Sequence, residues 1–141
     1  MPSDLAITLG LLRFAALEAP EKLRVLDDYQ ERCDSERAGG PHVWNPCVEV
    51  IESLWQDTNS CAHETAFQDK FTQEDRKLLG EIAAVTWEIL EKHYSELVSR
   101  SVFQSPVGRQ LSSLCAKALT RLQTGGEEVL PFWDLMCFTC D

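Results

Sequence analysis

The chain has 141 residues, of which 44% are hydrophobic, and its 23 acidic and 13 basic side chains give a formal net charge of −10. A chain of this length buries about 68–70% of the surface that its unfolded form exposes, so we expect one helical domain over residues 1–141. Seven glycines and six prolines are too few for low-complexity disorder. The acidic excess argues against direct binding to nucleic acid, which requires clustered Lys and Arg.

The apolar run 5–17 raises the question of a signal peptide or a membrane anchor. It follows Asp4 where a signal peptide would carry basic residues, and no cleavage site follows it before Pro20. Its 13 residues are fewer than the roughly 20 that cross a bilayer. We therefore expect a buried helix in a cytoplasmic protein without a membrane partner. In that compartment the six cysteines are expected to be free thiols.

Helical periodicity dominates the chain, and the first half contains three expected helices. The first covers residues 4–17 and is apolar on most of its circumference, which is typical of a central helix. The second begins near Pro20, places Leu26 and Tyr29 on one side, and ends at Gly39-Gly40. The third begins with Asn45-Pro46, carries Trp55 inward, and is expected to end in the polar run 57–60, followed by a short helix within 61–71.

The longest expected helix begins at the Thr72 cap and reaches residue 100, with a break near His93 as the alternative. Two sets of apolar residues share its buried side. They are Leu78, Ile82, Val85 and Ile89, widened by Trp87, Leu90, Tyr94 and Val98. The last long helix begins at Ser105-Pro106, ends before Gly125-Gly126, and is followed by an apolar tail, 127–141. The sequence thus predicts an all-α fold: a compact single-domain bundle of five or six helices with the tail packed on it.

The cysteines allow an alternative function based on metal or thiol chemistry. Cys137 and Cys140 form the only C-x-x-C in the chain, and Cys61 and His63 are the residues that could complete a zinc site through space. The motif has no second C-x-x-C and no βαβ context, so packed thiols remain the favoured interpretation. We expect no cofactor.

Catalysis finds little support in the sequence. Nucleotide-binding, nucleophile-elbow and calcium-loop motifs are absent, and the H-E-x-x-H pattern fails because its second histidine is replaced by Phe67. An enzyme using His93 and neighbouring carboxylates is the weakest hypothesis.

Charge is distributed unevenly along the chain. Asp27, Glu31 and Asp34 lie at helical spacing in the acidic first half, and the last long helix carries the basic stripe Arg109–Lys117–Arg121. The favoured interpretation is that this stripe faces the three carboxylates within the bundle; the alternative is a dipolar surface that attracts a charged partner.

The aromatic tail also allows two interpretations. Phe132 and Trp133 are residue types that dominate binding interfaces, so the tail could dock on another protein or on a second copy of the chain. Packing on its own bundle is favoured because a short tail after Gly-Gly can fold straight back.

These features predict a non-enzymatic acidic helical module that binds another protein. A partner with a basic surface is expected, in an inhibitor, immunity-type or adaptor role. The expected binding residues are Asp27, Glu31, Asp34, Phe132 and Trp133, with Glu49 and Glu52 as an extension of the acidic face. The alternative is a zinc- or thiol-dependent protein that uses the C-terminal C-x-x-C with Cys61 and His63.

Overall fold

The computed structural model describes the backbone of residues 4–36, 45–123, 125 and 129–139, and the side chains of these residues except 36 and 137–139. Within these ranges the chain forms seven α-helices, two short 3-10 helices and no strand. The α-helices are α1 (Asp4–Ala16), α2 (Ala19–Glu36), α3 (Pro46–His63), α4 (Gln73–Lys92), α5 (Tyr94–Val98), α6 (Pro106–Leu122) and α7 (Phe132–Thr139). The 3-10 helices are η1 (Thr65–Phe67) and η2 (Ser101–Gln104).

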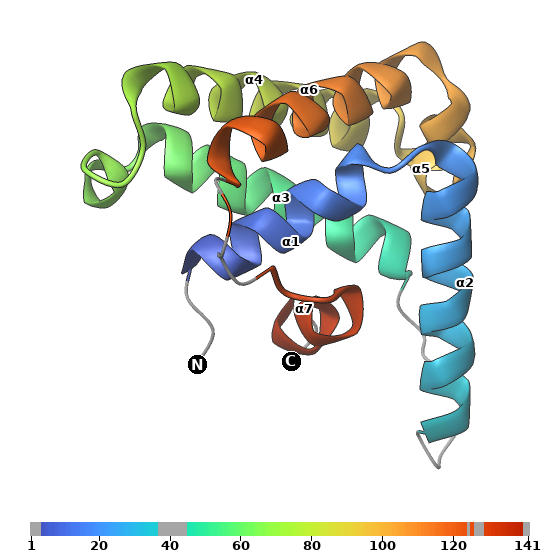
Figure 1. Cartoon of the computed structure of the whole chain (residues 1–141). Helices are drawn as coiled ribbons and strands as arrows, with labels where there is room; N and C mark the ends of the chain where they lie inside the picture. The colour runs from blue at the N-terminus through green and yellow to red at the C-terminus, as the bar shows by residue number, and fades with distance from the viewer. Residues whose placement is uncertain (1–3, 37–44, 124, 126–128, 140–141) are drawn as a thin grey trace.

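Four helices form the centre of the bundle. The antiparallel pair α3 and α4 packs against α1 and α6, and each of the four contacts two of the others around a ring (Figure 1). α1 is buried on nearly every side, as its all-round apolar sequence predicts. We call α1, α3, α4 and α6 the four-helix core.

The remaining long elements lie against one end of this core. α2 stands across the end of α1 and extends past the core, and α7 packs beneath α1 and beside α2 (Figure 1). Leu130, Leu135 and Met136 of the tail are buried. The predicted all-α single-domain bundle with its tail packed on it is confirmed. We call α2 and α7 together the arm.

Three predicted helix starts are confirmed by their capping hydrogen bonds. The side chains of Asn45, Thr72 and Ser105 accept from backbone N–H groups within the first turn of α3, α4 and α6. Such a cap satisfies an N–H that has no partner inside the helix, so it fixes the first residue.

The predicted end of the third helix is wrong. α3 continues through the polar run 57–60 to His63, and the expected short helix in 61–71 is reduced to the single turn η1. Thr58 is fully buried and donates its hydroxyl hydrogen to the Leu54 carbonyl oxygen at 2.7 Å. Burial of Leu54, Thr58 and Cys61 on one side of the helix outweighs the turn propensity of Asp, Asn and Ser.

The longest predicted helix breaks at His93, which was the alternative interpretation, and this break gives α4 and α5. With the tail helix α7, the count within the described ranges is seven α-helices where five or six were expected. Leu78, Ile82, Val85 and Ile89 are buried as predicted.

The widened apolar arc of this helix is a second correction. Trp87 is 46% exposed, Tyr94 51% and Val98 46%. Trp87 lies on the opposite side of α4 from the buried stripe. It is exposed because α1 and α6 pack against other sides of the α3–α4 pair. In the described part of the chain, no helix is both long and apolar enough to span a bilayer.

Candidate partner-binding surface

The predicted acidic residues all lie on the exposed side of α2. Asp27, Glu31 and Asp34 are exposed and successive, about one turn apart, and Asp28 adds a fourth exposed carboxylate. The opposite side of the helix buries Leu26. Amphipathic packing of α2 therefore turns its acidic side outward.

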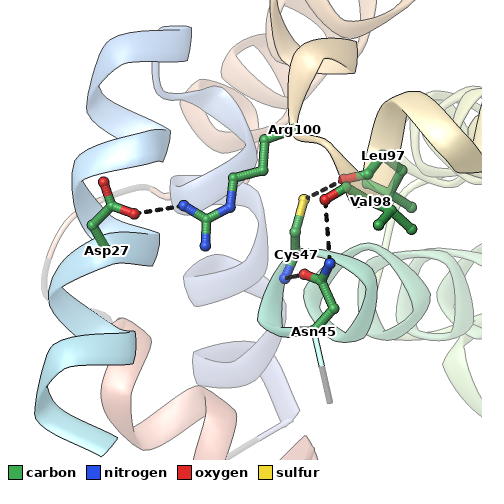
Figure 2. Close-up of polar contacts among 6 residues, drawn as sticks. All are labelled: Asp27, Asn45, Cys47, Leu97, Val98 and Arg100. Atoms are coloured by element: carbon green, nitrogen blue, oxygen red, sulfur yellow. Dashed lines mark hydrogen bonds and ion pairs between the residues drawn. The ribbon is translucent and has the colours of Figure 1, made fainter. Parts of the chain in front are cut away.

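One of these carboxylates has a basic partner within the chain. Arg100 Nη1 donates to Asp27 Oδ1 at 2.6 Å, across the gap between α2 and the turn that follows α5 (Figure 2). Arg100 has a left-handed backbone, with φ of 70°. Asp34 instead accepts from Gln30 Nε2 at 3.1 Å.

The turn that carries Arg100 is fixed to the start of α3. The Asn45 side chain donates to the Val98 carbonyl oxygen at 3.3 Å, and the Cys47 thiol donates to the Leu97 carbonyl oxygen at 3.3 Å (Figure 2). These bonds satisfy carbonyl groups at the end of α5 and so set the position from which Arg100 reaches α2.

The basic stripe on α6 does not pair with α2, which corrects the favoured expectation. Arg121 donates to Asp75 at 2.7 Å and to Glu74 at 3.2 Å, both in the first turn of α4. Arg109 and Lys117 are exposed. Because α6 packs against α1 and α4, its basic side lies beside α4 and away from the acidic side of α2.

The predicted aromatic residues of the tail make contacts within the chain. The Phe132 ring lies 4.9 Å from that of Phe14 and 5.6 Å from that of Tyr29, measured between centroids. Trp133 lies 5.2 Å from Tyr29, and the Arg32 guanidinium covers its ring at 3.9 Å. Both residues are half-buried. They attach α7 to α1 and α2.

A second exposed surface was not identified from the sequence. The Trp55 and Trp87 rings stack across the outer seam between α3 and α4, with centroids 4.9 Å apart and planes inclined by 36°. Beside them lies a surface groove of about 730 Å³. Its lining comprises Ala62, Gly80, Ala84, His63 and Phe71 together with the polar side chains Gln68, Gln73, Arg76, Lys77 and Glu81. The signal was present in the sequence, because Gly80, Ala84 and Trp87 recur at helical spacing opposite the buried stripe of α4.

Lys22 is the most unusual titratable residue and was also missed. It is fully buried, donates to the Leu17 carbonyl oxygen at 2.7 Å and to Ser112 Oγ, and lies 5.2 Å from the Phe103 ring centroid. Burial lowers its pKa to about 8, against a smaller opposing effect of nearby Cys115. Lys22 precedes Leu26 by four residues, so its helical position indicated the buried side.

Asp57 is a second ionisable group with a shifted pKa, and its side chain is half-buried. Burial raises its pKa to about 6, a hydrogen bond from Thr8 acts in the opposite direction, and the charge of Asp4 adds to the rise. Its Oδ2 atom is buried and has no hydrogen-bond partner among the described residues. The ionised form is therefore destabilised at neutral pH.

Two of the residues proposed for a metal site, Cys61 and His63, lie in different surroundings. The Cys61 thiol is buried 4.0 Å from Thr8 Oγ1, and burial together with the Asp57 charge raises its pKa to about 12. His63 is exposed and lines the surface groove. The side chains of Cys137 and Cys140 lie outside the described residues. Over the described ranges, no three His, Cys, Asp or Glu residues are grouped to hold a metal ion.

Four of the six cysteines have described side chains, and these four are free and buried. They are Cys33, Cys47, Cys61 and Cys115. Burial raises the pKa of Cys47 and of Cys115 to about 12. A thiol with so high a pKa stays protonated and is a poor nucleophile, so Cys47 and Cys115 act as small apolar residues.

Comparisons of the chain with protein-family models, with curated proteins and with solved structures found no match.

Proposed function

We propose that the chain is a non-enzymatic acidic module that binds another protein through the exposed side of α2, and that the partner presents a basic surface. The observation that supports this most directly is the orientation of α2, which extends past the core (Figure 1). Its carboxylates lie on the exposed side of the helix. Of the three predicted carboxylates, Asp27 alone has an ion-pair partner among the described residues.

The negative charges on the exposed side of α2 favour a basic partner. Asp28, Glu31 and Asp34 lie within two turns of α2, and their repulsion is relieved when a cationic surface approaches. The Arg32 side chain is directed onto the Trp133 ring. A module that covers a cationic groove of its partner acts as an inhibitor, and one that leaves the partner's active surface open acts as an adaptor.

The test compares two triple variants with the same change in charge. The first, Asp27→Asn with Glu31→Gln and Asp34→Asn, neutralises the acidic side of α2. The control, Glu64→Gln with Asp69→Asn and Glu96→Gln, neutralises three exposed carboxylates elsewhere. Both variants and the wild-type chain serve as bait in parallel captures from the native cell, and association rates with each captured protein are then measured against salt concentration.

We expect a basic partner that the wild-type chain and the control retain and the α2 variant loses. Its association rate should fall steeply as salt rises, because the Debye length is about 10 Å at 0.1 M. Equal loss in both triple variants would show that only net charge matters, and equal retention would exclude α2 as the binding surface.

A further inference from the structure

The outer seam of α3 and α4 carries a second surface, which we call the tryptophan face: Trp55, Ala62, Gly80, Ala84 and Trp87. Two contacts across the seam place these residues on one side. The Trp55 and Trp87 rings stack at 4.9 Å, and a Cβ at Gly80 would lie 3.6 Å from the Ala62 Cβ. The face therefore has an aromatic pair, in which Trp87 is exposed and Trp55 half-buried. Two turns away it has a surface groove whose lining combines the small residues with charged side chains, among them Arg76, Lys77 and Glu81.

Close packing of α3 against α4 does not require a glycine at position 80. At Gly10 an added Cβ would lie 2.6 Å from the Leu130 carbonyl oxygen, and at Gly108 it would collide with the Val102 carbonyl oxygen. At Gly80 the nearest atoms are at ordinary van der Waals distance. A glycine in the middle of a helix destabilises it relative to alanine, so the groove is kept open at a cost in stability that the fold does not demand.

The aromatic end of the face is acidic. Glu52 lies about one turn before Trp55 and Glu91 one turn after Trp87, and because the two helices are antiparallel, both lie toward the same end of the face. Glu88 lies beside Trp87, and Glu49 lies one turn before Glu52. Among the described residues, no Lys, Arg or His forms an ion pair with these four glutamates.

An exposed indole flanked by unpaired carboxylates is complementary to a guanidinium or ammonium group. The cation lies over the ring face while its hydrogen atoms reach the carboxylates. We propose that the tryptophan face binds a helical segment of another protein that places an arginine over Trp87, between Glu52 and Glu91, and an aliphatic side chain in the groove at Gly80. The inference names the chemistry of the basic partner and so rests on the proposed function.

The spacing of the face sets the spacing of the ligand. Gly80 and Trp87 are seven residues apart on α4, a distance of about 10.5 Å along the helix axis. A helical ligand running alongside α4 matches this distance with an arginine and a leucine seven positions apart. A second copy of the chain is the less favourable occupant, because each copy carries a net charge of −10.

The probe is a synthetic helical peptide of about 18 residues, long enough to hold a helix, with leucine and arginine seven positions apart on one face. It is made in both orders along the chain. The control peptides carry glutamine for the arginine. Binding is followed by NMR of the indole N–H groups, with Trp55→Phe and Trp87→Phe variants to assign the resonances.

We expect the arginine peptide in one of the two orders to shift the Trp55 and Trp87 indole resonances and to leave that of Trp133 in place. Trp87→Ala should weaken binding about tenfold or more, as should Glu52→Gln combined with Glu91→Gln. Gly80→Leu should abolish binding by filling the groove. Circular-dichroism melting checks that each variant is folded, which the exposure of Trp87 and Glu91 favours.

Other results would overturn the proposal. They are equal affinity for the glutamine peptides, shifts confined to Trp133, no binding of either arginine peptide, or a dimer in sedimentation equilibrium that Trp87→Ala dissociates. The last result would assign the face to a second copy. If the triple α2 variant still binds the peptide, the tryptophan face acts independently of the surface in the proposed function. If only the α2 interaction is lost, the proposed function is contradicted and the proposal for the tryptophan face is not.

Discussion

The four-helix core and the arm are held together by different kinds of contact. In the core, aliphatic side chains at regular helical intervals are buried between four neighbouring helices; Leu9, Ile51 and Ile82, for example, are fully covered. The arm combines Leu26 with aromatic rings on α2 and α7. Two long basic side chains attach it to the rest of the chain: Lys22 of α2 donates to Ser112 of the core, and Arg100, in the turn after α5, donates to Asp27.

This difference in contacts explains which parts of the protein surface remain available for binding. The core uses nearly all of the periodic apolar surface of its helices, apart from the tryptophan face at its outer seam. The arm is fixed along one side only, so the acidic side of α2 remains in solvent. Local opening should therefore require less free energy in the arm than in the core.

The largest expected effect is in the core. Ile82→Ala should lower the free energy of unfolding by about 2–5 kcal/mol, because Ile82 is fully buried and its loss leaves a cavity. Chemical denaturation measures the change. The control is Val98→Ala, at a residue that is 46% exposed, and it should change stability by less than about 0.5 kcal/mol. Equal losses in the two variants would contradict the burial pattern.

Alkaline pH should affect the core and the arm in opposite directions. The buried thiols Cys47, Cys61 and Cys115 of the core have pKa values raised to about 12. Above pH 9 the unfolded chain loses these protons while the folded chain keeps them, so stability falls with pH. For Lys22 of the arm, with a pKa lowered to about 8, the folded chain loses its proton first, so its contribution rises with pH up to about 10.5.

Three thiols against one lysine give a net loss that approaches about 3 kcal/mol per pH unit near pH 10, at about 1.4 kcal/mol for each group, because there the thiols of the unfolded chain are mostly ionised. Urea denaturation at several pH values, in the presence of a reductant, measures this slope. Cys115→Ala should flatten the slope, and Lys22→Met should steepen it. A slope that neither substitution alters would show that other groups govern the alkaline transition.

Asp57 tests whether the core contains one unfavourable charge. Because its folded pKa is raised to about 6, its contribution to stability is present at pH values below 3.8 and is lost as pH rises through 6. Asp57→Asn should stabilise the protein by about 1–3 kcal/mol at pH 7 and bring no gain at pH 3.5. Asp34→Asn on the exposed side of the arm is the control. A stabilisation that is independent of pH would assign the effect to packing.

The smallest effect is expected in the arm. Phe132→Ala removes two ring contacts, with Phe14 and Tyr29, that together stabilise the α7 attachment by about 1–2 kcal/mol. Native-state hydrogen exchange should show faster exchange in α7, by about tenfold or more, and unchanged exchange in α4. Equal acceleration in both helices would show that the arm and the core unfold as one unit, which would break the distinction between them.

Much of the fold could be predicted from local sequence. The cap-plus-proline pairs Asn45-Pro46 and Ser105-Pro106 fixed two helix starts, since their chemistry acts within one turn. The buried stripe of α4 followed from its 3.6-residue period. The end of α3 could not be predicted, because the polar residues 57–60 favour a turn locally. A continued helix is more stable only because the neighbouring α1 covers Thr58 and Cys61.

The sequence by itself determined the starts of α3, α4 and α6, the buried stripe of α4 and the acidic side of α2, because each depends on residues within a few positions of one another. Only the tertiary structure decided which helices pair. It placed Arg121 beside Asp75 instead of Asp27, and Arg100 beside Asp27. It also left Trp87 exposed against Trp55 and buried Lys22 between α1 and α6. Such placements join residues tens of positions apart, and they depend on how all the helices pack together, which no local pattern encodes.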